Sequence, residues 1–271
     1  MLDTKFAEKY GPWALVAGAS EGMGEAFSRA CARRGLNVLM IARGEEKLRA
    51  AAARIENDYG VQTRVACVDL SNREFLKGID EACGGIELGL VVYNAAYSMV
   101  GRFTSIALED HLKEIDVNVR GPMMLCHHLL PSFMERRRGG IIVLSSMSAL
   151  QGTAMVANYA ATKAYDAGLA EGLWSEMLEH GVDVMTCLAG ATATPNYLSA
   201  TPQQPTDPIG KPMSADDVAE GALNDLGKMP RSTPGRRNRF LSFAISRLLG
   251  KERAIRTVSR ETKRLYDNLA E

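Results

Sequence analysis

The stretch "LVAGASEGMGEAF", residues 15–27, places three glycines where a short apolar run gives way to a helical segment. The spacing is Gly18-x-x-x-Gly22-x-Gly24. Glycine permits positive φ and lets the backbone approach a pyrophosphate closely, and the N-terminus of the following helix offers unpaired N–H groups. Taken alone, the stretch is either a phosphate cradle or a structural tight turn.

Outward from this stretch, short β-rich runs alternate with longer helical segments. The β-rich runs are almost continuously apolar, which is typical of strands buried on both faces of a parallel sheet. This alternation predicts an α/β, Rossmann-type, doubly wound parallel sheet with helices on both faces, in a single domain. The expected strands are 13–18, 36–42, 62–70, 88–96, 139–148 and 182–190, and the expected helices are 22–34, 44–60, 72–82, 108–138 and 158–180.

The sequence changes character after Ala193. The segment 193–214 carries five of the ten prolines, and an irregular segment of that length in a compact domain is often functional. A well-capped helix is expected after it, followed by a basic, amphipathic tail at 231–271. We expect one domain over residues 1–271, made of a core at about 10–195, a substrate lid at about 193–214 and a C-terminal helical extension at about 215–271.

Composition excludes several classes of protein. With 271 residues, of which 46% are hydrophobic, the chain can bury a substantial core. Lys plus Arg and Asp plus Glu both number 32, so the chain lacks the basic excess of a general nucleic-acid binder. The charged N-terminus does not resemble a secretory signal, and no window of about 18 residues is apolar enough to span a membrane.

The cysteines and histidines predict neither disulfides nor a metal site. The five cysteines are scattered and form no C-x-x-C pair, which favours a reducing, cytoplasmic location. Cys67 and Cys187 lie in strand-like runs, where we expect them to be small buried hydrophobic residues. The four histidines have no metal-ligand spacing.

The end of the second expected strand indicates which dinucleotide is bound. An acidic residue there would hold the ribose hydroxyls of NAD, but this strand ends in Ala42 and Arg43. Arg43 can pair with a 2′-phosphate, whereas the alternative is that it is merely a solvated side chain. The missing acidic residue favours the first role, and so NADP(H) as cofactor. Asp69, after the third strand, either accepts a hydrogen bond from an adenine amine or caps the next helix.

The segment "SSMSALQGTAMVANYAATKAY", residues 145–165, carries the strongest set of reactive groups. Tyr159 and Lys163 are four residues apart on an expected helix, so their side chains share a face. Free tyrosine has a pKa of about 10, and a neighbouring ammonium favours the phenolate. Ser146, at the end of the fifth strand, can hydrogen-bond the same substrate oxygen. Together these groups predict acid–base chemistry on a carbonyl or hydroxyl.

These landmarks occur in the order found in short-chain dehydrogenases/reductases, which the chain resembles over roughly residues 10–195. The opening, the second strand and the C-terminal extension are similar to a subgroup of hydroxysteroid dehydrogenases and long-chain 3-oxoacyl reductases. The matching motifs are the glycine loop at 18–24, "VDL" at 68–70, "YNAA" at 93–96, "DVNVRG" with Asn118, Ser146, Tyr159 with Lys163, and "AGATAT" at 189–194.

The resemblance implies a role for each matched residue. Tyr159 would exchange the proton with the substrate oxygen, Ser146 would polarise that oxygen, and Lys163 would bind the nicotinamide ribose and lower the tyrosine pKa. Asn118 would hold a water molecule in a proton relay. The expected cofactor contacts are Gly18, Ser20, Glu21, Gly22, Met23, Gly24, Arg43, Asp69, Leu70, Asn94, Tyr159, Lys163, Thr192 and Thr194.

Three positions depart from the family's pattern. Ala17 replaces a threonine whose hydroxyl ties the glycine loop to the next turn, Ala96 replaces a glycine, and Ala189 replaces a proline. None of the three removes a catalytic group. We therefore expect an active enzyme whose glycine loop is tethered more loosely.

The residues expected near the mouth of the site indicate a hydrophobic ketone or secondary alcohol as substrate, steroid-like or fatty-acyl. A non-catalytic NADP(H)-binding sensor or scaffold is the rival interpretation. The basic tail either packs on the domain or a second subunit, or contacts a membrane surface. The resemblance also implies a homodimer or homotetramer. The mouth residues are Tyr97, Met99, Val100, Met155, Pro195, Tyr197 and Leu198, and the small helix residues that would permit close subunit contact are Ala160, Ala164, Ala167, Gly168 and Gly172.

Overall fold

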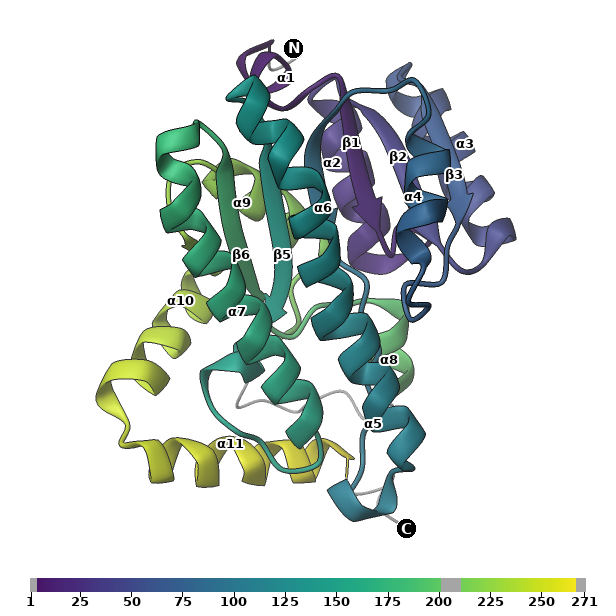
Figure 1. Cartoon of the computed structure of the whole chain (residues 1–271). Coiled ribbons are helices and arrows are strands. Elements are labelled where there is room, and N and C mark those ends of the chain that lie inside the picture. The colour runs from purple at the N-terminus through teal and green to yellow at the C-terminus, as the bar shows by residue number, and fades with distance from the viewer. Residues whose placement is uncertain (1–3, 201–210, 267–271) are drawn as a thin grey trace.

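Seven strands form one sheet at the centre of the structure, and every neighbouring pair runs parallel (Figure 1). The computed structural model describes residues 4–200 and 211–266. The order β3-β2-β1-β4-β5-β6-β7 reverses between β1 and β4, which creates a crevice at their carboxyl ends. The strands are β1 (Trp13–Ala17), β2 (Asn37–Ala42), β3 (Thr63–Cys67), β4 (Leu88–Tyr93), β5 (Gly140–Ser146), β6 (Asp183–Ala189) and β7 (Arg231–Ser232).

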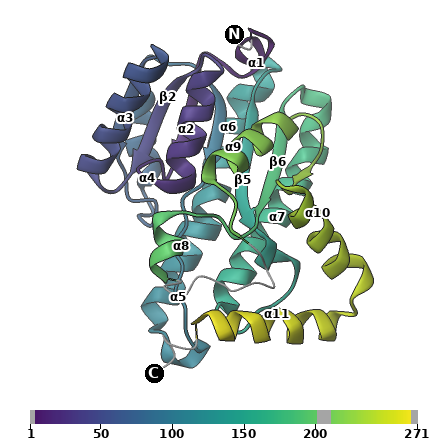
Figure 2. The ribbon, with the colours of Figure 1, turned by 180° about the vertical axis from the view of Figure 1, so that it is seen from behind.

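Helices cover both faces of the sheet, so the doubly wound α/β prediction is confirmed (Figures 1 and 2). One face packs against α2 (Gly22–Arg33), α3 (Glu45–Tyr59) and α9 (Ala215–Asp225), and the other against α4 (Phe75–Cys83), α6 (Gly121–Arg136) and α7 (Ala157–Met177). Each interface contains its own cluster of buried apolar side chains. Alternate residues of a strand feed the two clusters, which explains the apolar runs of the sequence.

The edge strand β3 is less buried than the central strands, contrary to the expected burial of Cys67. Every residue of β1 and β4 is buried, whereas β3 is only partly buried along its length. Cys187, in β6, is a buried free thiol as predicted, but Cys67, at the end of β3, is exposed. The prediction for Cys67 was wrong because an edge strand has a neighbour on one side alone, and its outer residues meet solvent.

The long helix expected at 108–138 consists of three parts. α5 (Leu108–Ile115) runs into a π-helical turn at Asp116–Arg120, and α6 follows without a break. Such a turn inserts an extra residue into the helix and is frequent at functional sites. Among the short elements that the sequence did not predict are α1 (Thr4–Tyr10), α8 (Pro195–Ala200) within the expected lid, and β7.

The basic tail forms an arm that runs along the body of the domain. α10 (Arg236–Phe243) continues into a π-helical turn at Ala244–Leu248, and α11 (Lys251–Tyr266) then crosses the amino-terminal end of α7 (Figures 1 and 2). The Ser259 hydroxyl accepts a hydrogen bond from the Ala154 amide at 3.0 Å, and Ala254 is buried. Among the described helices, none is both long and apolar enough to cross a bilayer.

Candidate active site

The carboxyl ends of the central strands bring the predicted site residues to one edge of the sheet. β1 ends immediately before Gly18, β4 immediately before Asn94, and β5 at Ser146 itself. These strands are neighbours in the order β1-β4-β5. Segments far apart in the sequence therefore meet at the place where the strand order reverses, which is where ligands bind in sheets of this kind.

The glycine loop packs so closely against its neighbours that Gly18 and Gly24 have no room for a side chain. Gly18 and Gly22 have φ values of 81° and 61°. A Cβ on Gly18 would lie 2.8 Å from the Cα of Ala95, and a Cβ on Gly24 would clash with the Gly18 carbonyl oxygen. This cradle, opening onto the N-terminus of α2, fits the pyrophosphate of a dinucleotide.

Asn94 holds the cradle to the end of β4. Its side-chain amide donates to the Gly18 carbonyl at 3.0 Å, and its backbone amide donates to the Ala17 carbonyl at 3.1 Å. The amides of Gly18 and Ala19 both donate to the Ile41 carbonyl of β2, at 2.7 and 3.0 Å. The loop is therefore fastened on two sides without the threonine hydroxyl that Ala17 lacks.

The remaining residues predicted around the loop differ in exposure. Ser20 and Met23 are half-buried, and Met23 packs against the apolar cluster beneath α2. Glu21 is exposed and forms an ion pair with Lys47, whose Nζ lies 2.8 Å from the Glu21 carboxylate. Leu70 is buried in the cluster on the other face of the sheet.

Arg43 follows β2 directly, and its exposed side chain forms no hydrogen bond or ion pair with any other residue that the structure describes. Asp69 accepts hydrogen bonds from the amide and hydroxyl of Ser71, at 2.9 and 2.7 Å. Burial alone would raise the pKa of Asp69, but these hydrogen bonds and nearby Arg43 lower it below its ordinary value. Asp69 thus closes a turn ahead of α4, which begins only at Phe75.

Thr192 and Thr194 lie where the segment after β6 passes the glycine loop. Thr192 bridges to Met213, so the two ends of the segment expected to be a lid are joined. Thr194 lies beside the loop, because a Cβ on Gly22 would approach its side chain to 3.2 Å. Its hydroxyl also accepts from the amide of Tyr197 at the start of α8. Residues 201–210 of the expected lid lie outside the described residues.

Ser146 ends β5, and Tyr159 and Lys163 lie on the first two turns of α7. The Ser146 hydroxyl accepts from the Ser148 amide at 3.2 Å, in the 3-10 turn that follows β5. Tyr159 is half-buried on the first turn of α7, and Lys163 is buried one turn later. The Lys163 Nζ lies 5.9 Å from the centre of the Tyr159 ring, so the two side chains share a face as predicted.

Asn118 lies in the π-helical turn between α5 and α6 and is fully buried. Its side chain pairs with the backbone of Tyr97, accepting from the amide and donating to the carbonyl, both at 2.8 Å. It also donates to the Thr162 hydroxyl at 3.1 Å, and that hydroxyl donates to the Tyr159 carbonyl at 2.8 Å. Asn118 therefore connects the loop after β4 to the first turns of α7.

Asp166 is a neighbour of Lys163 that the sequence analysis missed. Its carboxylate lies 2.9 Å from the Lys163 Nζ, and both side chains are buried. The signal was present in the sequence, because Asp166 is three residues after Lys163 and residues with that spacing meet on one helix face.

The end of α11 reaches the same region, which the sequence analysis also missed. Burial raises the pKa of Tyr266, and the nearby phenols of Tyr197 and Tyr159 raise it further. The mouth residue Met99 lines a small hollow with Tyr159, whereas Met155 is buried. The site is therefore enclosed by the loop after β4, by α8 and by the C-terminal helix.

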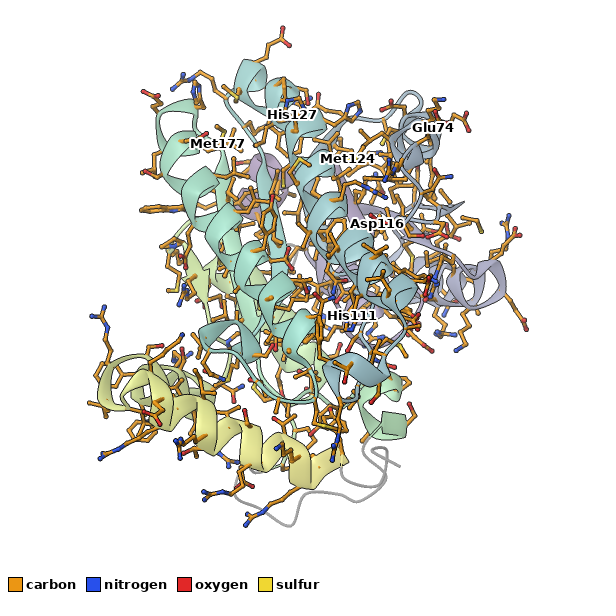
Figure 3. All side chains as sticks on the ribbon, turned by 60° about the horizontal axis from the view of Figure 1, so that its bottom comes forward. Glu74, His111, Asp116, Met124, His127 and Met177 are labelled. Carbon is orange, nitrogen blue, oxygen red and sulfur yellow. The ribbon has the colours of Figure 1, made fainter. Side chains whose placement is uncertain are left out.

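His111, His127 and His128 lie on the α5–α6 segment, and His180 lies in the 3-10 turn that follows α7. Figure 3 shows His111 on α5 and His127 farther along the segment, on α6. His128 is bound to Asp80 at 2.6 Å, and the His111 ring faces the Phe103 carbonyl at 3.0 Å. Among the residues described, no three His, Cys, Asp or Glu side chains are grouped as metal ligands.

Comparisons with known proteins agree with this geometry. Residues 12–205 match the family model described as short chain dehydrogenase. A 7beta-hydroxysteroid dehydrogenase of Clostridium sardiniense is 34% identical over 234 residues, which cover 86% of this chain and 89% of that protein. The inactive hydroxysteroid dehydrogenase-like protein 1 of Homo sapiens is 35% identical over 191 residues, or 69% of this chain and 58% of that protein.

Solved structures give the same result. A structure from work on 7beta-hydroxysteroid dehydrogenase stereoselectivity superposes with a TM-score of 0.87 at 31% identity, and covers 93% of this chain and 98% of that chain. A short-chain dehydrogenase from Sphingobium yanoikuyae, in complex with NADPH, has a TM-score of 0.77 at 25% identity, and covers 88% and 94%.

Proposed function

Because the chain belongs to the short-chain dehydrogenase/reductase family, whose members are nicotinamide-dependent oxidoreductases, we propose that it interconverts a hydrophobic ketone and a secondary alcohol with NADP(H) as cofactor. One observation carries the proposal: the Lys163 Nζ lies 5.9 Å from the Tyr159 ring centre on α7, and β5 ends at Ser146, at the edge of the sheet where β1 leads into the glycine loop. Fold alone does not define activity, but this set of groups is specific to carbonyl and hydroxyl chemistry.

In this mechanism each side chain acts on a named atom. The Tyr159 phenol gives its proton to the carbonyl oxygen during reduction and takes it back during oxidation. The Ser146 hydroxyl donates to the same oxygen and orients it. The buried Lys163 ammonium stabilises the phenolate, and Asn118 fixes the neighbouring backbone. The bound nicotinamide would supply the hydride chemistry.

The cofactor would lie across the cradle, with its pyrophosphate at Gly18, Gly22 and Gly24. The preference for NADP(H) rests on Arg43, an exposed guanidinium directly after β2, at a strand end that carries no acidic residue of its own. Replacement of Arg43 by alanine should weaken NADPH binding by roughly 10- to 100-fold, which corresponds to one charge-assisted contact. NADH binding should change little. An equal loss with both cofactors would contradict the role of Arg43.

The substrate is proposed to be steroid-like or fatty-acyl. Two observations support this class: Met99, Phe103 and Ile106 line a hollow with Tyr159, with Tyr197 of α8 and Tyr266 of α11 nearby, and relatives act on hydroxysteroids. A panel of steroid, acyl and aromatic ketones, followed by NADPH oxidation, tests it. Tyr159→Phe should abolish turnover and leave cofactor affinity largely unchanged. Retained activity in that variant would exclude the mechanism.

A non-catalytic sensor or scaffold that binds NADP(H) is the second candidate. It is favoured by the relative named as inactive, which is 35% identical over its matched region. The intact set of Asn118, Ser146, Tyr159 and Lys163 supports the enzyme instead. The same ketone panel distinguishes the enzyme from the scaffold, since a scaffold would bind NADPH but would not oxidise it with any of the ketones.

We further propose a cytoplasmic homodimer or homotetramer. All five cysteines are free thiols, which suits a reducing compartment. Gly168 and Gly172, on α7, have open space where a Cβ would stand, so a second helix could approach closely. Light scattering measures the subunit number. Phe240 and Phe243 are exposed among arginines of the arm, and co-sedimentation with anionic vesicles, with and without residues 231–271, tests the alternative membrane contact.

A further inference from the structure

We propose that Asp166 is a positioning residue of the reacting centre, whose buried carboxylate keeps the Lys163 side chain charged and aimed past Tyr159. The inference rests on the proposed function, in which the Lys163 ammonium stabilises the Tyr159 phenolate. It concerns a residue outside the four groups assigned to the reaction above.

The hydrogen bonds of Lys163 leave its ammonium little freedom. An ammonium has three N–H donors. One donates to the Asp166 carboxylate at 2.9 Å and a second to the Leu144 carbonyl of β5 at 2.8 Å. With Nζ 5.9 Å from the Tyr159 ring centre, one donor remains for the site. Two fixed hydrogen bonds thus set the direction of the third.

Burial makes the charge of Lys163 depend on a counter-ion. Lys163 is 2% exposed and Asp166 is 1% exposed. An ammonium with no partner in such a place loses its proton rather than remain charged. Burial alone would lower the pKa of Lys163, but the charge of Asp166, the nearby Tyr159 and the hydrogen bond that Lys163 donates to Asp166 reverse this and raise it.

The surroundings of Asp166 identify Lys163 as its partner. Burial raises the pKa of Asp166 to about 6, although Lys163 opposes the rise, so the carboxylate is ionised at neutral pH. The groups that respond to its charge are uncharged at neutral pH: Tyr93 on β4, Cys126 on α6, and Tyr165 on its own helix. Arg120 acts on Tyr93 alone among these.

The second carboxylate oxygen of Asp166 indicates that the ion pair is not there for stability. Asp166 Oδ1 is buried and has no hydrogen-bond partner among the described residues. A buried ion pair with an unsatisfied oxygen is a poor device for stability, because well-packed apolar residues in its place are often at least as stable. We therefore assign to this carboxylate the role of binding the Lys163 ammonium, which lies beside Tyr159.

The direct test measures the pKa of the Lys163 ammonium in the protein without cofactor, by a pH titration monitored with NMR of nitrogen-15-labelled lysine. The Lys163 signal is identified as the one that disappears in Lys163→Met. In Asp166→Asn, the pKa of Lys163 should fall by about two units or more, as expected of a buried lysine without a counter-ion. An unchanged Lys163 titration would overturn the inference.

Two further variants separate this role from a structural one. Asp183→Asn removes another partly buried carboxylate, one that accepts from Tyr10 at 2.5 Å at the opposite end of β6. It should leave the Lys163 titration unchanged. Lys163→Met combined with Asp166→Leu removes both buried charges, and should fold with near parental stability but without turnover. If Asp183→Asn moved the Lys163 titration equally, the effect would be general and the inference wrong.

Kinetics supply a second readout. In Asp166→Asn, kcat for alcohol oxidation should fall by roughly 10- to 100-fold at neutral pH, in the range of one acid–base contribution, with little change in KM. The acid limb of the kcat/KM profile should move to higher pH, because a neutral Lys163 no longer stabilises the phenolate. A lower kcat with an unmoved profile would contradict the inference. Activity in Tyr159→Phe would instead refute the proposed function and leave the NMR result standing.

Discussion

The cofactor cradle and the reacting centre lie at the same edge of the sheet, yet different physical features shape them. In the cradle, backbone surfaces pack where any Cβ would clash, as at Gly18 and Gly24. In the reacting centre, buried polar groups bind one another, as Lys163 binds one carboxylate oxygen of Asp166 and Asn118 binds the backbone of Tyr97. The cradle should therefore fail when atoms are added, and the reacting centre when partners are removed.

The largest effect is expected for Gly24→Ala. The new Cβ would clash with the Gly18 carbonyl and approach the Asn94 side-chain amide to 2.8 Å. Moving that backbone should cost about 3 kcal/mol, which corresponds to at least roughly 100-fold weaker NADPH binding. Fluorescence titration with NADPH measures the loss.

Gly44→Ala is the matched control for Gly24→Ala. Gly44 precedes α3, has a φ of −93°, and has nothing within 4 Å of an added Cβ. This variant should bind NADPH like the parent. Equal affinities for Gly24→Ala and Gly44→Ala would mean that the close backbone approach does not shape the cofactor site.

Asn118→Ala tests the opposite kind of damage. It leaves the backbone N–H and C=O of Tyr97 without the partners that now lie 2.8 Å away. Stability in urea should fall by about 2 kcal/mol, and turnover should fall with it. Thr162→Val removes only the hydroxyl that Asn118 and the Tyr159 carbonyl share, so its cost should be closer to about 1 kcal/mol. A larger loss in Thr162→Val would contradict this ranking.

Two carboxylates extend the comparison to pH. Asp166 has a pKa raised to about 6, so the folded protein binds a proton there at a pH where the unfolded chain, with a pKa of about 3.9, does not. This favours the folded state as pH falls from 7 to 4. Asp69 has a lowered pKa, so its contribution is present above the unfolded pKa and is lost on acidification.

The measurement is urea unfolding of the parent, Asp166→Asn and Asp69→Asn at several pH values. Between pH 7 and 4 the parent should gain stability relative to Asp166→Asn, by about 1–3 kcal/mol for a shift of this size. Relative to Asp69→Asn it should lose a smaller amount, because Asp69 is exposed. Parallel pH curves for the parent and Asp166→Asn would show that the carboxylate is not buried as described.

The two regions also differ in how far the sequence predicted them. The cradle follows from local spacing, and the shared face of Tyr159 and Lys163 follows from helix periodicity. The features that the sequence did not predict depend on tertiary packing. They are the exposure of Cys67 on an edge strand and the position of Tyr266 near Tyr197. The ion pair of Asp166 had a local signal, but its burial depends on the sheet beneath α7.

The smallest effect is expected for Ala17→Thr, which restores the hydroxyl that the family's pattern places before Gly18. Ala17 is fully buried, and the loop is already held by the amides of Gly18 and Ala19 and by Asn94. One more hydrogen bond should therefore tighten NADPH binding by about two- to tenfold. Ala17→Val is the control, since it adds the same volume without the hydroxyl and should bind no better than the parent. If Thr and Val behave alike, packing rather than tethering limits this turn.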